Sequence, residues 1–209
     1  FSIILLLVGR SYIKNTGINN FELLILLLFS IFSIFLIPTS NNIPILYLYL
    51  ELQGISFYIL TASTRKNQYS LESGLKYFIL GSFSSILLLI GTNIVYAYSA
   101  LLNFTDLLLF IKDLDLFVTD YTLLGVGFIF IIISFLFKFY AAPFHLWVSD
   151  IYQGAPTIIT AFFSVIPLPS LFYIFSKIVS LTFLKMYMIY NPIFNITIVL
   201  SLFIGTLGA

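Results

Sequence analysis

The segment from Leu123 to Trp147 reads LLGVGFIFIIISFLFKFYAAPFHLW, and its first fifteen residues carry no charge. Leu, Ile and Phe cover every side of a helix over this run, without the alternation of apolar and polar positions that is typical of a transmembrane strand. A helix crosses the hydrocarbon core with about 20 residues, because each residue adds about 1.5 Å. Pro143 cannot donate a hydrogen bond to the carbonyl of Phe139. We therefore expect a membrane helix over residues 123–140 that breaks just after Lys138.

The same test finds five more such stretches and a partial one in the 209-residue chain. The five are residues 21–38, 43–62, 75–98, 157–184 and 194–209, and the partial one is residues 1–8. Residues 101–117 mix Leu and Phe with three aspartates and a lysine, which predicts a short interfacial helix or a membrane-surface loop. Pro167 and Pro169 free backbone carbonyls in a second helix, and broken helices in a membrane generally line cavities. The sequence thus predicts an all-α, polytopic transmembrane helix bundle of about 6–7 spans, in a single transmembrane domain over residues 1–209.

Charged residues make up only 8% of the chain, against 61% hydrophobic and 19% aromatic residues. A soluble domain carries about 25% charged residues, so we expect lipid or other membrane proteins to cover most of this surface. A net charge of +1 with scattered basic residues excludes a phosphate-binding stripe, and with it nucleic acid as a partner. The sequence contains no cysteine, which excludes thiolate metal sites and iron–sulfur clusters on this chain.

Basic side chains gather on one side of the alternating spans. Arg10, Lys14, Arg65 and Lys66 lie on this side, and an acidic stretch over residues 106–120 lies on the other. The positive-inside rule places the basic side in the cytoplasm, or in the matrix if the membrane is mitochondrial.

Ionisable residues inside the spans are the first candidates for function, because each costs about 2.5 to 3.5 kcal/mol at mid-depth. Glu51 lies in the middle of residues 43–62, where a short carboxylate cannot reach either interface. Lys138 lies beside the carbonyls that Pro143 frees, and a lysine in such a place can hold and release a proton. Lys177 lies deep in residues 157–184 and is interpreted as a buried, functional lysine.

Lys76 and His145 each allow two interpretations. Lys76 lies less than two turns from Ser70, which could cap its helix, so Lys76 is either interfacial or functional. A lone histidine near a membrane surface is usually a hydrogen-bonding residue, although beside a broken helix and a lysine it could relay protons. These residues alone leave three classes open: a proton or cation translocator, a scaffold subunit whose charges are structural and, least favoured, a membrane-embedded enzyme.

Three segments carry a resemblance to a known family. They read LYLYLELQGISFYIL over residues 46–60, GLKYFILGSFSS over residues 74–85, and FK at residues 137–138 with AAPFHLWVSDIYQGAPT over residues 141–157. Together they resemble the antiporter-like membrane subunits of respiratory NADH:ubiquinone oxidoreductase, which is complex I. The run YQGAPT over residues 152–157, followed by AFFSV, is similar to the subunit 2 branch and differs from the sister subunits and from sodium/proton antiporters.

The resemblance implies a subunit of a proton-translocating enzyme, driven by quinone reduction elsewhere. It implies no redox centre or cofactor on this chain, with NADH, FMN, iron–sulfur clusters and ubiquinone bound elsewhere in the complex. The expected partners are other membrane-arm subunits and membrane lipids. The family pairs a glutamate with the lysine before the helix break, which map to Glu51 and Lys138. Its other functional positions map to Lys76 and His145.

Two departures from the family pattern affect these expectations. Leu168 stands where the family usually has a central lysine, and Lys177 lies nine residues further on, about 13 Å along a helix. Lys177 could replace the central lysine only if the water molecules that conduct protons follow a different route. Otherwise the subunit is a structural or coupling element without its own proton path. The family also continues beyond Ala209, so we expect a separate chain to supply the remaining helices.

The remaining alternative is a stand-alone cation/proton antiporter subunit, which residues 152–157 disfavour. Abundant Phe, Ile, Tyr and Asn have A/T-rich codons, which favours an organelle gene. We therefore expect the mitochondrial inner membrane, with a bacterial plasma membrane as the alternative.

Overall fold

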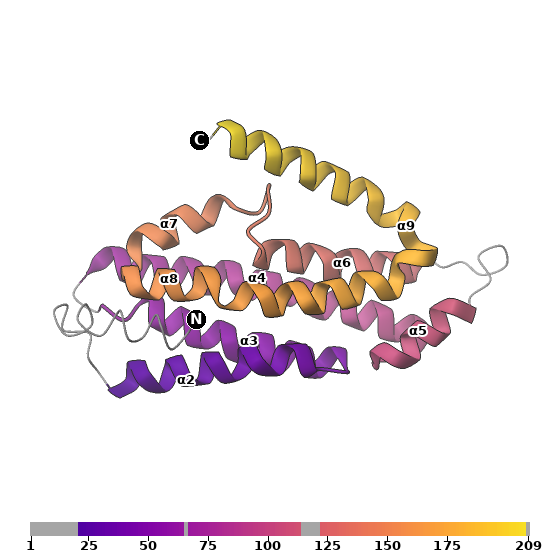
Figure 1. Cartoon of the computed structure of the whole chain (residues 1–209), viewed down its shortest axis with the longest axis horizontal. Coiled ribbons are helices and arrows are strands. Elements are labelled where there is room, and N and C mark those ends of the chain that lie inside the picture. The colour runs from indigo at the N-terminus through magenta and orange to yellow at the C-terminus, as the bar shows by residue number, and fades with distance from the viewer. Residues whose placement is uncertain (1–20, 65–66, 114–121, 208–209) are drawn as a thin grey trace. The chain divides into compact units, whose positions relative to one another are not determined.

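The computed structural model describes residues 21–64, 67–113 and 122–207, without the side chains of residues 181–188. All regular elements in this part of the chain are helices, which confirms the all-α prediction (Figure 1). They are α2 (Phe21–Leu36), the 3-10 helix η1 (Ile37–Thr39), α3 (Ile43–Thr61), α4 (Gln68–Ser99), α5 (Phe104–Asp113), α6 (Thr122–Lys138), α7 (Leu146–Gly154), α8 (Thr157–Val165) and α9 (Pro167–Leu207).

Five helical segments are long and apolar enough to cross a membrane: Phe21–Thr39, Ile43–Thr61, Gln68–Ser99, Thr157–Ser180 and Ile189–Leu207. Thr122–Lys138 is a shorter apolar helix. All six predicted full spans therefore appear as helices, and α5 falls within the predicted interfacial segment. The chain is a multi-pass membrane protein. The partial span over residues 1–8, the basic residues Arg10, Lys14, Arg65 and Lys66, and the acidic residues 114–120 lie outside the described residues.

The start of α4 differs slightly from the prediction, because the helix begins at Gln68, three residues before the start that a cap at Ser70 would give. The side chain of Asn67 accepts a hydrogen bond from the backbone N–H of Tyr69 at 3.1 Å, which is a capping contact. The expected cap, Ser70, instead donates its hydroxyl to the carbonyl of Thr61 at 2.6 Å and so ties α4 to the end of α3.

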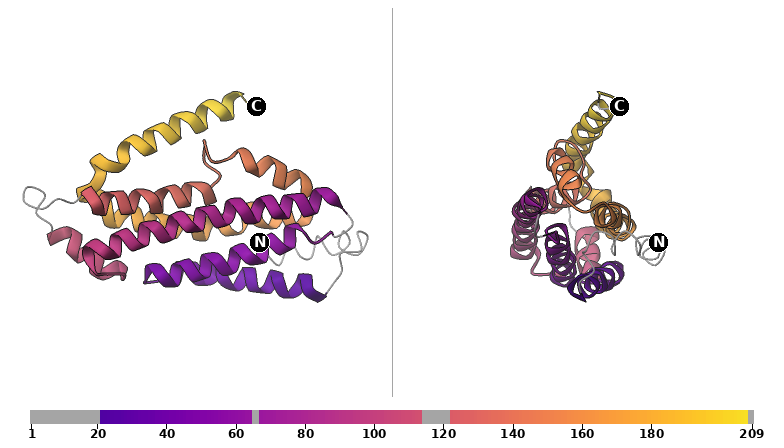
Figure 2. Two further views of the ribbon diagram at one scale, coloured as in Figure 1. Left: turned by 180° about the vertical axis from the view of Figure 1, so that it is seen from behind. Right: turned by 90° about the vertical axis from the view of Figure 1, so that its left-hand side faces the viewer.

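The helix break after Lys138 is confirmed. Helix α6 ends at Lys138, and the next residues form turns that Figure 2 shows as a narrow ribbon without helical coils. Tyr140 has a φ of 59°, in the left-handed region that ordinary residues rarely adopt. A second break separates α8 from α9 at Ile166, directly before Pro167, as the prolines in this region predicted.

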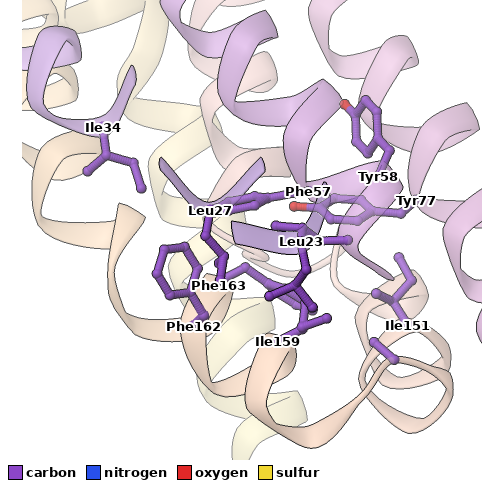
Figure 3. Close-up of a cluster of buried hydrophobic side chains, with 12 residues drawn as sticks. Leu23, Leu27, Ile34, Phe57, Tyr58, Tyr77, Ile151, Ile159, Phe162 and Phe163 are labelled. Atoms are coloured by element: carbon purple, nitrogen blue, oxygen red, sulfur yellow. The ribbon is translucent and has the colours of Figure 1, made fainter. Parts of the chain in front are cut away.

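The described helices form two compact units. The first unit contains residues 21–39, 48–64, 67–82 and 147–172, and the second contains residues 40–47, 83–113, 122–146 and 173–207. An aromatic cluster fills the core of the first unit (Figure 3). The Phe57 ring lies 6.1 Å from that of Phe162 and 5.9 Å from that of Phe163, and Leu23 and Leu27 of α2 pack against the same cluster.

In the second unit, α4 and α6 approach each other through two glycines. A Cβ atom on Gly91 would lie 2.7 Å from the carbonyl oxygen of Gly127, and one on Gly127 would lie 3.1 Å from that of Gly91. Small residues at a crossing let the backbones of two membrane helices come this close. This contact fixes how far α4 and α6 are shifted relative to each other along their axes.

Candidate functional site

The most highly charged cluster in the described part of the first unit surrounds Lys76. The Nζ atom of Lys76 lies 2.8 Å from Oε1 of Glu72 and 2.8 Å from Oδ2 of Asp150. Glu72 lies one turn earlier on α4, while Asp150 comes from α7, 74 residues away in the sequence. We call Glu72, Lys76 and Asp150 the charged triad.

Two contacts hold α7 where Asp150 can reach Lys76. A Cβ atom on Gly154 would lie 2.5 Å from the carbonyl oxygen of Tyr69, so only glycine lets the end of α7 lie this close to the start of α4. The ring of Trp147 stacks on that of Tyr77, with 5.5 Å between the ring centroids. Tyr77 directly follows Lys76, and Trp147 lies less than one turn before Asp150.

The charged triad carries a net charge of −1 when all three groups are ionised, since one ammonium faces two carboxylates. The side chains of Glu72, Lys76 and Asp150 are 59%, 40% and 55% exposed, so the triad lies at the surface of the isolated chain. A change in the charge of any one member would alter its electrostatic interaction with the other two.

Glu51 lies on α3 as a half-buried side chain. Its Oε1 atom is buried and has no hydrogen-bond partner among the residues that the structure describes. Helices α3 and α4 are antiparallel, with Ala62 beside Gly74 and Tyr58 beside Gly81. In this alignment Lys76 lies level with residue 60 of α3. Glu51 therefore lies nine residues, or about 13 Å, away from Lys76 along the helix axis. A proton therefore needs intermediate groups to pass between Glu51 and the triad.

Lys138 and His145 lie at the two ends of the break in the second unit. Lys138 is the last residue of α6 and is half-buried, and His145 directly precedes α7. The Nδ1 atom of His145 is buried and has no hydrogen-bond partner within the described ranges. Glu51 belongs to the first unit and Lys138 to the second, so their pairing stays a prediction.

Lys177 contacts the connection between η1 and α3. Its Nζ atom donates hydrogen bonds to the carbonyl of Ser40 at 3.1 Å and to Oδ1 of Asn41 at 3.4 Å, and it lies 5.0 Å from the centroid of the Phe104 ring. These contacts join α9 to the chain segment before α3 and to the start of α5. They favour an anchoring role, while the role of Lys177 as a proton relay stays a prediction.

Sequence reasoning found Lys76 but missed its partner Asp150. The signal was weak, because Asp150 lies in a polar part of residues 141–157 and nothing in the sequence states which helix it faces. No group of three or more His, Cys, Asp or Glu side chains in the described residues could hold a metal ion.

Comparisons with known proteins agree with this architecture. Residues 40–209 match a family described as the transmembrane part of NADH:quinone oxidoreductase and the Mrp antiporter. NADH-ubiquinone oxidoreductase chain 2 of Marchantia polymorpha is 36% identical over 204 residues, which are 95% of this chain and 40% of that protein. NADH-quinone oxidoreductase subunit N 1 of Acidiphilium cryptum is 33% identical over 196 residues, which are 94% of this chain and 40% of that protein.

A solved structure has the same fold. A chain of respiratory complex I from Thermus thermophilus superposes with a TM-score of 0.65 at 24% identity, over 76% of this chain and 34% of that chain. The chain thus spans about 40% of the length of the curated relatives that it matches.

Proposed function

Because this chain belongs to the NADH:quinone oxidoreductase/Mrp antiporter transmembrane family, we propose that it is a membrane-arm subunit that contributes to proton translocation coupled to quinone reduction. The observation that carries this proposal is the charged triad, in which Lys76 lies 2.8 Å from a carboxylate of its own helix and from one of α7. Glu51 and Lys138 add two titratable groups on other membrane helices.

The proposed mechanism is electrostatic. A proton that binds to one carboxylate of the triad removes a negative charge, which weakens the hold of the triad on the Lys76 ammonium and changes the proton affinity of that amine. Movement of Glu51 and Lys138 together or apart would load and release a proton in the same way. This chain has no redox centre in our proposal, so NADH, FMN, iron–sulfur clusters and ubiquinone act on other subunits of the complex.

The proposed partners are other membrane-arm subunits and lipid. Large apolar side chains such as Phe35, Leu48 and Phe203 are mostly exposed in the isolated chain, and a bilayer or neighbouring subunits would cover them. The A/T-rich codon usage implied by the composition supports the mitochondrial inner membrane as the location. A separate chain that completes the family's set of helices stays a prediction.

A structural or coupling role is the second candidate. It is favoured by Leu168, which takes the place of the central lysine that the family usually carries. In that case the charges fix helix packing, and the subunit transmits motion without its own proton path. A stand-alone cation/proton antiporter is disfavoured by residues 152–157, and it would purify without quinone-linked subunits.

The substitution Lys138→Met tests the proposal in the assembled complex. The test compares protons translocated per NADH oxidised, in sealed vesicles, for the native and substituted complexes. We expect this ratio to fall while the content of flavin and iron–sulfur clusters stays unchanged, because Lys138 is remote from any redox group in our proposal. An unchanged ratio in a fully assembled complex would favour the structural role.

A further inference from the structure

The last membrane helix, Ile189–Leu207 within α9, is covered by its own chain far less than the other spans are. Over 18 residues of this span, 11% are buried, against 33–44% in the four other candidate spans. Figure 1 shows the segment as the yellow end of α9. A membrane helix with so little cover faces either lipid or another helix on most of its sides, and the chemistry of its outward residues indicates which.

The outward face of this segment is the one opposite Tyr190 and Thr197. These two residues are buried, and their spacing of seven places them on one side of the helix. Asn195 lies about 160° around the helix from Thr197 and is exposed. Val199 and Leu202 follow Asn195 by four and seven residues, so they share its face, and both are mostly exposed.

Asn195 also lies close to the middle of the membrane. It is three residues, or about 4.5 Å, from Ile198, the central residue of the span. Lipid tails offer an amide no hydrogen bond, so an outward asparagine at this depth is unfavourable in lipid. An asparagine in a contact between two membrane helices instead forms a hydrogen bond across the interface.

Helix α2 shows what a surface suited to lipid looks like in this chain. Its outward stripe consists of Leu24, Leu28, Phe32 and Phe35, which are all apolar and each more than half exposed. The outward face of the last helix interrupts the same kind of apolar surface with an amide near mid-membrane. This difference favours a protein partner over lipid for the face that carries Asn195.

We propose that the face formed by Asn195, Val199 and Leu202 packs against a transmembrane helix of a separate chain, the one that supplies the remaining helices of the family's fold. Asn195 forms a hydrogen bond with a polar side chain of that helix, while Val199 and Leu202 make apolar contacts. This chain spans about 40% of the length of its curated relatives, so most of their sequence has no counterpart in it. The inference rests on the proposed function for the complex in which this partner is found.

The sign of the effect of Asn195→Leu separates a helix partner from lipid. Leucine is suited to both surroundings but cannot form the hydrogen bond. With a helix partner, the amount of assembled complex on native gels should fall about three- to tenfold, as for the loss of one interhelical hydrogen bond. With lipid around the residue, the substitution removes a polar group from an apolar solvent, so assembly should stay the same or increase. That result would overturn the proposal.

Ser201→Ala is the matched control for this substitution. Ser201 is also exposed and lies three residues from the centre of the span, but its hydroxyl donates to the carbonyl of Ile198 in its own helix at 2.9 Å. The control should therefore leave the amount of assembled complex unchanged. A fall in Ser201→Ala equal to that in Asn195→Leu would contradict a specific role for the Asn195 amide.

A photo-reactive residue, benzoylphenylalanine, in place of Leu202 identifies the occupant directly in native membranes. It should cross-link to a membrane segment of another chain, and mass spectrometry of the linked peptide should show similarity to the part of the curated relatives that this chain does not match. The same probe in place of Phe32 on α2 is the control and should link to lipid. Linkage at Leu202 to lipid alone, to a second copy of this chain, or to a chain without that similarity would overturn the proposal.

The interface and the proton-translocating role can fail separately, because assembly and cross-linking do not measure translocation. Native assembly in Asn195→Leu, together with fewer protons per NADH in Lys138→Met, would overturn the interface and leave the proposed function standing. Reduced assembly in Asn195→Leu, together with a native ratio in Lys138→Met, would overturn proton translocation and leave the interface.

Discussion

The two carboxylates of the charged triad play different parts at the scale of single residues. Glu72 lies on the same helix as Lys76, and an exposed ion pair of this spacing stabilises a helix only weakly. Asp150 lies on α7, so its ion pair with Lys76 also holds α7 against α4. The loss of either carboxylate changes the net charge of the triad from −1 to 0, but only the loss of Asp150 removes a link between helices.

This difference predicts unequal effects for Asp150→Asn and Glu72→Gln. Both substitutions should lower the number of protons translocated per NADH oxidised, because the neutral triad no longer attracts an additional proton. Asp150→Asn should have the larger effect and should also lower the amount of assembled complex, measured by native gel electrophoresis. A larger effect of Glu72→Gln on both quantities would contradict the assignment of Asp150 as the partner that connects the helices.

Lys177 gives a second prediction at this scale. Lys177→Met removes the hydrogen bonds to the carbonyl of Ser40 and the side chain of Asn41, so the segment before α3 loses its contact with α9. We expect less assembled complex but a native ratio of protons to NADH in the complex that does assemble. Normal assembly with a lowered ratio would instead assign Lys177 to the proton path, as the sequence first suggested.

At the scale of helices, the crossing of α4 and α6 depends on the absence of side chains at Gly91 and Gly127. A methyl group at Gly91 would meet the backbone oxygen of Gly127 at 2.7 Å and the backbone nitrogen of Ile131 at 2.9 Å. Neither backbone atom can move away as a side chain can. The crossing is therefore sensitive to any side chain added at Gly91.

Gly91→Ala should therefore destabilise the subunit by about 1–3 kcal/mol, the usual effect of overpacking. Gly205→Ala is the matched control, because a Cβ atom on this helical glycine would meet nothing within 4 Å. Alanine favours a helix over glycine by up to about 1 kcal/mol, so the control should be neutral or slightly stabilising. Thermal unfolding of the purified complex in detergent measures both effects, and equal midpoints for the two variants would contradict this account of the crossing.

The helices themselves were predictable from the sequence, because long apolar runs and prolines act locally. The end of α6 at Lys138 follows from Pro143, and the break before α9 follows from Pro167. The start of α4 was placed three residues too late, because the capping residue is Asn67 rather than Ser70. Local composition could not show that this polar turn packs against the end of α3.

The candidate site was predictable only in part. Glu51, Lys76 and Lys138 stand out because a charge within an apolar run is expensive and therefore conspicuous. Asp150 does not stand out in this way, because it lies in a polar segment. Its importance depends on which helix it faces, and that information exists only in the folded chain.

At the scale of the whole molecule, the chain has far too few charges for a soluble protein, and some of the charges that the structure describes lie at specific contacts between helices. Lys76 binds two carboxylates, and Glu51 presents a buried oxygen with no hydrogen-bond partner in the described residues. A protein that only needed to pack its helices could do so with apolar side chains alone. The retained charges are therefore the main argument for proton translocation by this subunit.

The most direct test of this claim is the substitution Glu51→Gln in the complete complex. Glutamine keeps the shape and the hydrogen-bonding oxygen of Glu51 but cannot take up a proton, so helix packing should be preserved. The measurement is the number of protons translocated per NADH oxidised, in sealed vesicles with native cofactor content. A severalfold fall in this ratio, with normal assembly, is the predicted result. An unchanged ratio would contradict the account and would leave Glu51 as a structural residue.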